Sequence, residues 1–228
     1  MCGDSLRFQF KLSYILAKYV TNQLGENHEQ IRNRYYGFQV IIGEAVKLLI
    51  LFFLSLLLGI FETTVIAAVL FALLRRVAGG YHMDTYGSCL IISLGLLIIA
   101  GSIGQYTTYL WSDLIIYFLI SIVFIISLFS AIKWAPDDNI NRPITEPEDI
   151  KKFKRSSLFF IIIWAMISII SILLKMGSYK AYVISGAFSV LFEIFSITPA
   201  GHRFFNIIKN GFVKVKKTRK LEQYKKEA

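Results

Sequence analysis

The sequence is poor in charged residues, histidine, cysteine and proline for its length. Only 18% of its 228 residues are charged, below the roughly one quarter of a typical soluble domain, and 55% are hydrophobic. The three histidines and two cysteines form neither an HExxH motif nor a cluster with metal-ligand spacing. The composition argues against an ordinary soluble domain, and we predict no metal site and no cofactor.

The hydrophobic residues are gathered in long runs. Five runs are nearly free of charge and close to the length of about 20 residues that a bilayer core requires: 40–60, 90–110, 114–134, 158–174 and 181–199. A sixth run, 61–74, is shorter and is compatible with a thin span, a re-entrant segment or a buried helix. The pattern predicts an all-α, polytopic integral membrane protein.

Lysine and arginine distinguish the two sides of the predicted membrane domain. They are concentrated in four segments: 1–39, 75–76, 133–155 and 203–228. Residues 104–113 contain none and residues 175–180 contain two. Because cytoplasmic loops are enriched in lysine and arginine, this distribution favours six spans, counting 61–74, with both termini in the cytoplasm. Segment 75–89 then faces the cytoplasm of a multi-pass protein of the cell membrane.

The chain divides into three parts on this topology. Residues 1–39 are an amphipathic interfacial segment, 40–202 the six-span membrane domain and 203–228 a basic cytoplasmic tail. Apolar residues at helical spacing predict an amphipathic helix over residues 5–25: Leu12, Ile15, Leu16, Tyr19 and Val20.

The net charge of +10 is explained by loops beside anionic lipid, so we expect the bilayer and no nucleic acid as a partner. We predict no signal peptide.

The segment "RRVAGGYHMDTYGSCL", residues 75–90, contains the residues with the clearest catalytic chemistry, His82 and Cys89. On an unbroken helix they would lie about 10 Å apart along the axis, too far for thiol and imidazole to touch. The intervening residues include the turn or cap residues Asp84, Gly87 and Ser88. The chain can therefore break after His82 and begin a helix near Ser88. There the helix dipole favours a Cys89 thiolate, and His82 could accept the thiol proton.

Backbone N–H groups near Cys89 could hold an oxyanion. They would come from the start of the new helix, including Ser88, or from the Gly79–Gly80 turn. The plain alternative is that Cys89 is a small buried hydrophobe and His82 an interfacial residue. The pair alone favours this plain alternative, because cysteine and histidine often occur near each other by chance.

The wider pattern changes that balance. The motif "RRVAGGYH" with a cysteine seven residues after the histidine resembles the accessory gene regulator B (AgrB) family, membrane cysteine endopeptidases of Gram-positive bacteria. The basic amphipathic N-terminus, "GEAVK", "APDDNINRPI" and the lysine-rich tail agree in order and spacing with that family. The resemblance implies Cys89 as nucleophile and His82 as its partner. The arginine and glycine of the family pattern fall on Arg75 and Gly80.

The resemblance also implies a substrate and a reaction. An AgrD-like quorum-sensing propeptide would be cleaved at its C-terminal side through a thioester on Cys89, and a thiol of the peptide would then close a cyclic thiolactone. Some relatives of these substrates use serine and give a lactone, so the ring chemistry stays open. The family also suggests a homodimer.

Other ionisable residues each have a functional and a plain interpretation. Glu44 could orient the histidine, or it could simply pair with Lys47 one turn later. Asp84 could be the orienting acid, or a helix cap. Arg75 and Arg76 could bind the acidic C-terminal portion of a propeptide, or anchor the second span, and both roles can hold together.

Two other classes of protein compete with the endopeptidase. A small transporter would use Glu44, Lys47 and Glu193 to line a path, but the chain has no obvious pair of related halves. A non-enzymatic membrane scaffold would not need Cys89 or His82. Replacing Cys89 by alanine separates these classes, and we predict loss of cleavage.

Overall fold

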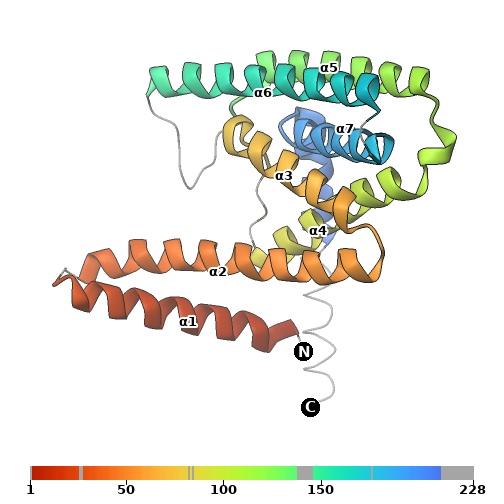
Figure 1. Ribbon diagram of the computed structural model, residues 1–228. Helices are drawn as coiled ribbons and strands as arrows, with labels where there is room; N and C mark the ends of the chain where they lie inside the picture. Colours follow the sequence, from red (N-terminus) through yellow and green to blue (C-terminus); the bar gives the residue numbers. More distant parts are fainter. Residues whose placement is uncertain are drawn as a thin grey trace. The chain divides into compact units, whose positions relative to one another are not determined.

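A computed structural model describes residues 2–25, 28–81, 83, 85–137, 146–175 and 177–211. Over these residues the structure is helical, with one β-bridge between Gly79 and Asp137, which confirms the all-α prediction. The labelled helices are α1 (Cys2–Gln23), α2 (His28–Leu57), α3 (Phe61–Ala78), α4 (Tyr86–Tyr106), η1 (Thr108–Leu110), α5 (Asp113–Trp134), α6 (Pro147–Leu174) and α7 (Tyr179–Ser196) (Figure 1). A further helix, Pro199–Gly211, follows α7. The chain forms two compact units, Met1–Leu54 and Ser55–Ala228.

The first unit is a hairpin of α1 and the greater part of α2. Its packed face differs from the predicted apolar face of the first helix. Ser13, Ala17 and Thr21 are buried, whereas Ile15 and Tyr19 are 61% and 62% exposed. Side chains four residues apart lie on one face, and small ones allow two helices to approach closely. The small residues therefore lie between the two helices of the hairpin, and the large apolar residues remain available to lipid.

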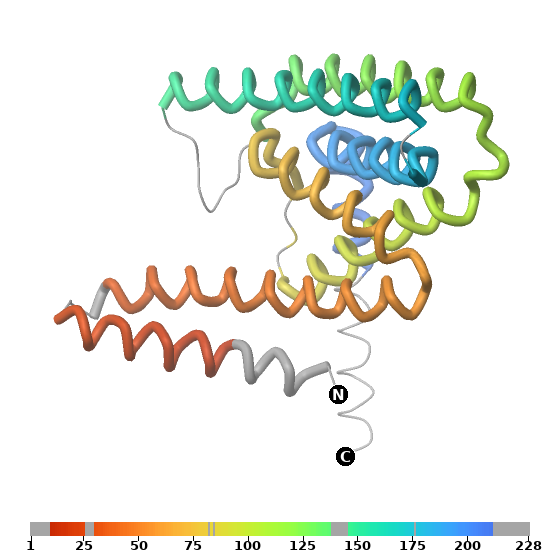
Figure 2. The backbone as a smooth tube through the Cα atoms, in the orientation of Figure 1, coloured from red at the N-terminus to blue at the C-terminus, as the bar shows by residue number. Residues whose placement is uncertain are grey.

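In the second unit, α5 and α6 lie side by side in opposite directions, and α3 and α7 pack beneath them (Figures 1 and 2). Local signals begin these outer helices. The Ser112 hydroxyl accepts a hydrogen bond from the Ile115 N–H at 3.4 Å and caps α5. Pro147 starts α6 with two acids in its first turn, where the helix dipole favours negative charge.

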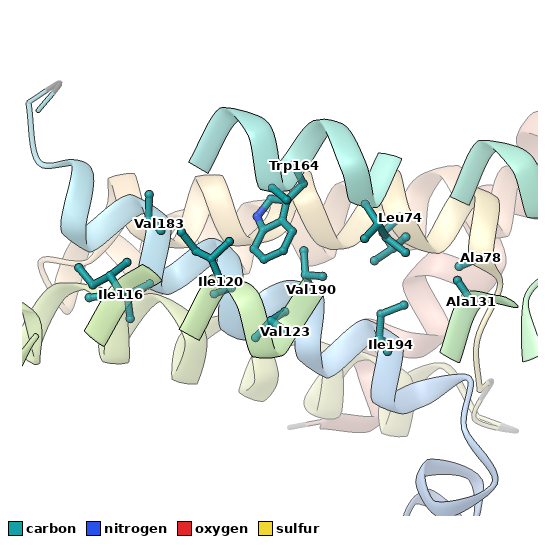
Figure 3. Packing of buried hydrophobic residues seen from close by; sticks show 14 of the residues in the cluster. Leu74, Ala78, Ile116, Ile120, Val123, Ala131, Trp164, Val183, Val190 and Ile194 are labelled. Carbon is teal, nitrogen blue, oxygen red and sulfur yellow. The ribbon is translucent and has the colours of Figure 1, made fainter. Parts of the chain in front are cut away.

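The core of the second unit joins α3, α5, α6 and α7. Figure 3 shows Trp164 of α6 directed toward Ile120 of α5 and Val190 of α7. Trp164 is 4% exposed and the other two are 2% and 0% exposed. In a bilayer, where lipid tails are as apolar as these side chains, contacts of this kind stabilise the fold through close packing.

Polar side chains line the contact between α3 and α7. The Ser185 hydroxyl donates to the Thr63 carbonyl at 2.7 Å, and the Ser189 hydroxyl donates to the Ala67 carbonyl at 2.6 Å. Both pairs advance by four residues in the same direction, so the two helices run parallel. Each serine satisfies its hydroxyl on a neighbouring backbone, which removes the cost of burying a polar group in an apolar interior.

All six predicted apolar runs are helical, but they differ in their suitability as spans. Four helices are long and apolar enough to cross a membrane: Gln30–Leu57, Tyr86–Tyr106, Asp113–Trp134 and Pro147–Leu174. Tyr179–Ser196 passes only together with Pro199–Gly211, from which it is bent by 84°. By length and composition the described chain has four, or up to five, candidate spans, and α3 is not among them. The helix α3 carries the charged residues Glu62, Arg75 and Arg76 near its ends. The helix α7 packs inside the second unit, with 11 of its 18 residues buried, and less apolar residues are tolerated there.

Candidate functional site

Cys89 lies in the first turn of α4, as the sequence predicts. Thr85 is the N-cap residue, and its hydroxyl accepts a hydrogen bond from the Ser88 N–H at 3.3 Å. The Cys89 N–H donates to the Thr85 carbonyl at 3.1 Å. Cys89 is a free, half-buried cysteine. The helix begins at Tyr86, slightly before the predicted position near Ser88, because Thr85 supplies the cap. A thiol in this place is accessible and lies at the positive end of the helix dipole.

His82 and Asp84 lie outside the residues that the structure describes, so their predicted roles stay predictions. The turn that precedes them is described. Gly79 ends α3 with a φ of 78°, and its N–H donates to the Arg75 carbonyl at 3.0 Å. The Ala78 carbonyl accepts from the Asp137 N–H at 2.8 Å, which ties the turn to the segment after α5.

Replacing Gly79 by alanine is expected to destabilise the protein by about 3 kcal/mol. Its φ is unfavourable for a residue with a side chain, and an added Cβ would lie 2.1 Å from the Asp137 carbonyl oxygen. Thermal unfolding in detergent measures the effect. Gly87→Ala is the matched control, because a Cβ at Gly87 meets nothing within 4 Å. Equal unfolding midpoints for the two variants would contradict the close approach.

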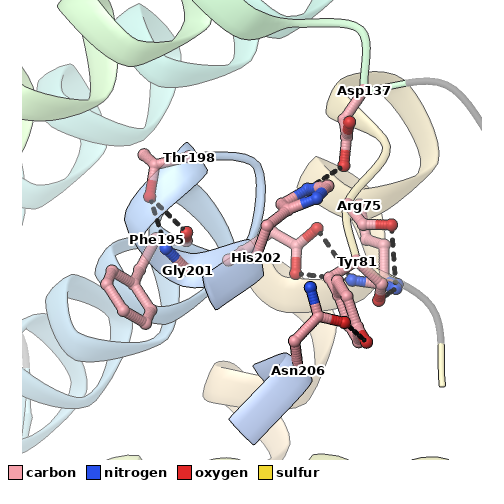
Figure 4. Close-up of polar contacts among 10 residues, drawn as sticks. Arg75, Tyr81, Asp137, Phe195, Thr198, Gly201, His202 and Asn206 are labelled. Atoms are coloured by element: carbon pink, nitrogen blue, oxygen red, sulfur yellow. Dashed lines mark hydrogen bonds and ion pairs between the residues drawn. The ribbon is translucent and has the colours of Figure 1, made fainter. Parts of the chain in front are cut away.

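Arg75 connects α3 to α7 (Figure 4). Its Nη1 lies 3.2 Å from Glu193 Oε2, and the Glu193 side chain is fully buried. Its Nη2 donates to the Tyr81 carbonyl at 2.6 Å. Gly80 lies against this pair, since an added Cβ would be 2.7 Å from Arg75 Nη1 and 3.0 Å from Glu193 Oε1. Arg75 therefore holds the backbone that leads to His82, with an acid of a distant helix as its counter-ion.

Tyr81 forms a second attachment of the same segment. Its hydroxyl donates to Asn206 Oδ1 at 2.7 Å, and its ring stacks on Phe205 with centroids 5.4 Å apart. The ring also meets the edge of His202, whose Nε2 lies 2.8 Å from Asp137 Oδ2. The helix Pro199–Gly211 thus contributes three side chains that contact Tyr81. We call Arg75, Tyr81, Asp137, Glu193, His202 and Asn206 the α3–α7 polar cluster.

The remaining predicted residues are placed as follows. Arg76 is exposed. Glu44, in the first unit, forms an ion pair with Lys47 at 2.6 Å, which is the plain interpretation of that pair. The N–H groups of Gly79 and Ser88 already have the hydrogen-bond partners given above. Gly80 is closely surrounded, since an added Cβ would also lie 2.5 Å from Ser196 Oγ. Among the described residues, no group of three or more His, Cys, Asp or Glu side chains could hold a metal ion.

Sequence reasoning did not find the α3–α7 polar cluster. From the sequence, Glu193 is considered only as a residue of a transport path, and no role is assigned to His202. One signal in the sequence could have paired Glu193 with Arg75. An isolated acid lies in one apolar run and an arginine lies at the end of another, and charges inside a membrane protein need partners. The choice between the possible partners required the tertiary structure.

The long apolar helices and the free cysteine at a capped helix start define a multi-pass membrane protein with an accessible thiol at one end of its helices. A family model described as "Accessory gene regulator B" matches residues 13–197, and the chain belongs to this AgrB family.

Relatives agree with this assignment. The chain is 24% identical over 196 residues to an AgrB-like protein of Clostridium perfringens, covering 84% of this chain and 92% of the relative. It is 25% identical over 184 residues to accessory gene regulator protein B of Staphylococcus aureus, covering 80% and 90%. The corresponding protein of Staphylococcus intermedius is 29% identical over 165 residues, covering 72% and 79%. No solved structure matches the chain.

Proposed function

We propose that this protein is a membrane cysteine endopeptidase that cleaves an AgrD-like propeptide at its C-terminal side. Membership of the AgrB family implies a role in peptide processing for accessory gene regulator quorum sensing. The observation that carries the proposal is the free Cys89 thiol in the first turn of a capped helix, half-buried and therefore accessible to a peptide.

The first step is attack of the Cys89 thiolate on a peptide carbonyl carbon. His82 takes the thiol proton and returns it to the amine of the C-terminal fragment as the C–N bond breaks. The N-terminal part of the propeptide remains on Cys89 as a thioester. The start of α4 favours the thiolate. Backbone N–H groups of the Gly79–Gly80 turn or of Ser88 are proposed to stabilise the oxyanion, for which those of Gly79 and Ser88 must exchange their present partners, the Arg75 carbonyl and the Thr85 hydroxyl.

The second step transfers the acyl group to the peptide itself. A thiol within the bound peptide attacks the thioester carbon, the Cys89 sulfur leaves as thiolate and is reprotonated, and a cyclic thiolactone is released. One thioester replaces another, so the reaction is nearly neutral in energy. The site must therefore hold the peptide folded and exclude water, which would otherwise hydrolyse the intermediate.

Two sets of residues are proposed to assist. Arg76 is exposed and can meet the acidic portion of a propeptide, whereas the guanidinium of Arg75 is engaged by Glu193 and the Tyr81 carbonyl. Arg75 would bind the propeptide only while it also keeps these two contacts. Asp84 remains a candidate for orienting His82. Glu44 is a weaker candidate, because it pairs with Lys47.

A covalent adduct on Cys89 tests the proposal. The protein is reconstituted in liposomes with the candidate propeptide and analysed by intact-mass and peptide mass spectrometry. We expect an adduct that carries the N-terminal part of the peptide, present in Cys2→Ser and absent in Cys89→Ser and His82→Ala. The Cys2→Ser variant is the matched control, since the chain has two cysteines. Binding of the propeptide without cleavage or an adduct would favour the transporter or the scaffold.

We also propose six spans, with both termini and segment 75–89 in the cytoplasm. The parallel direction of α3 and α7 supports this, because two even-numbered spans run the same way through a membrane. In a Cys2→Ser/Cys89→Ser background, a membrane-impermeant maleimide applied to intact cells is expected to label Tyr109→Cys but not Glu146→Cys. Tyr109 is 82% exposed and Glu146 is also exposed. The reverse pattern would contradict the proposed topology.

A further inference from the structure

We propose that Glu193 is a positioning residue for the cleavage reaction: through Arg75 it holds the backbone of Gly80 and Tyr81, which leads directly into His82. The inference rests on the proposed function. It assigns a role to an acid of α7 that lies 104 positions after Cys89 in the chain.

The contacts form a short chain of charge-assisted interactions. Glu193 Oε1 and Oε2 lie 3.3 and 3.2 Å from Arg75 Nη1, and Arg75 Nη2 donates to the Tyr81 carbonyl at 2.6 Å. The Gly80 carbonyl is within 3.5 Å of the same nitrogen. Arg75 also lies over the Phe71 ring at 5.9 Å, so its guanidinium is fixed on three sides. Such hydrogen bonds are the strong ones, and they determine where the backbone carbonyls point.

Helix packing alone does not account for an acid at this position. One and two turns before Glu193, α7 contacts α3 through Ser189 and Ser185, whose hydroxyls bond to backbone carbonyls. A buried ion pair usually adds little stability over an apolar pair of similar volume, because both charges must lose their hydration. Ionisable residues inside membrane domains are therefore candidates for function. Here Arg75, paired with Glu193, bonds to the carbonyls of Gly80 and Tyr81 just before His82. Ser185 and Ser189 bond instead to carbonyls of α3.

A second attachment restrains the same segment from the other side. The Tyr81 hydroxyl donates to Asn206 Oδ1 at 2.7 Å, and the Tyr81 ring packs on Phe205. The carbonyl and the side chain of Tyr81 are thus held by different helices, α3 and Pro199–Gly211. These contacts therefore fix the backbone up to Tyr81, the residue directly before His82 in the sequence.

Glu193→Gln is the first test, in the full-length protein with Cys2→Ser as the background. Glutamine has nearly the same shape but leaves Arg75 without its counter-ion, so the thermal unfolding midpoint is measured beside the rates. We expect single-turnover acylation of Cys89 by the propeptide to slow on the order of 100-fold, the effect of a displacement of about 1 Å, while the Kd of the propeptide is unchanged. Alkylation of Cys89 by iodoacetamide should slow toward the rate of His82→Ala. Glu193→Asp, which keeps the charge, should restore part of both rates.

Ser189→Ala is the matched control. It removes a buried hydrogen bond between the same two helices, one turn away from Glu193 and without contact to the catalytic segment. It should lower the thermal stability and leave acylation and alkylation at the rates of the background protein. Tyr81→Phe is the second variant, which removes only the hydroxyl that reaches Asn206 and should slow acylation with unchanged propeptide binding.

Two results would overturn the inference: acylation and alkylation at background rates in Glu193→Gln, or equal slowing in Ser189→Ala. Absence of an adduct in the background protein would instead contradict the proposed function. The iodoacetamide rates, which require no propeptide, would still decide whether Glu193 affects the reactivity of Cys89.

Discussion

Replacement of Cys89 by alanine is expected to abolish cleavage of the propeptide. The thiolate is the proposed nucleophile, and neither water nor another side chain can form the same acyl-enzyme. Loss of a catalytic nucleophile in other enzymes lowers the rate by about 10⁴-fold or more. His82→Ala removes a general base and is expected to lower the rate by about 10²–10⁴-fold. Liquid chromatography with mass spectrometry of the released C-terminal fragment measures both variants in liposomes.

The controls separate chemistry from folding. The helix start is stabilised by Thr85 and Ser88 rather than by the thiol, so Cys89→Ala should unfold at the same temperature as the native protein. Cys2→Ser should cleave normally. Cleavage by Cys89→Ala at even one tenth of the native rate would exclude the acyl-enzyme mechanism, whatever the effect of His82→Ala.

Replacement of Arg75 by alanine is expected to have the largest effect on stability. Glu193 is 0% exposed and would lose the cation that balances its charge, and the carbonyl of Tyr81 would lose its donor. Removing one partner of a buried ion pair costs about 3–5 kcal/mol. For a chain of this size the midpoint of thermal unfolding should fall by roughly 10 °C, measured by fluorescence-detected size-exclusion chromatography in detergent.

A paired substitution distinguishes stability from positioning. Arg75→Met combined with Glu193→Leu removes both charges, and we expect it to recover most of the thermal stability, because apolar pairs of similar volume replace buried ion pairs well. Cleavage should remain impaired, since nothing then holds the Tyr81 carbonyl. Arg76→Ala, at an exposed position, serves as the control and should change the stability by less than about 0.5 kcal/mol. An unfolding midpoint of Arg75→Ala equal to that of Arg76→Ala would show that the pair does not stabilise the fold.

The helices were largely predictable, because the hydropathy of each run by itself indicates a segment in an apolar environment. Residues 114–134 were predicted and the helix is Asp113–Trp134, and for 158–174 the end was right. The beginning of that helix was missed by eleven residues, because Pro147–Ser157 is a charged extension that hydropathy alone does not detect. The start of α4 before Cys89 was predictable for the same local reason: a helix start depends on cap and turn residues within a few positions. The preceding helix ends at Ala78, earlier than the break that was predicted after His82.

The packed faces were not predictable in the same way. For α1 the apolar face expected against lipid includes Ile15 and Tyr19, which are exposed, whereas the residues buried in the hairpin are Ser13, Ala17 and Thr21. A hydrophobic pattern shows which residues avoid water, but within a membrane protein large apolar residues can face lipid and small ones can face another helix. The sequence pattern does not distinguish these two environments.

The amino-acid sequence by itself determined the class of the protein and the approximate course of its helices, because these depend on local composition. Cys89 and His82 became the candidate catalytic pair only through the resemblance of the wider motif to the AgrB family. The tertiary structure alone decided the partners of Arg75 and Tyr81. Glu193 follows Arg75 by 118 positions and Asn206 follows Tyr81 by 125. Contacts over such separations arise from the packing of α3 with α7 and from the bend before Pro199–Gly211, which no local pattern records.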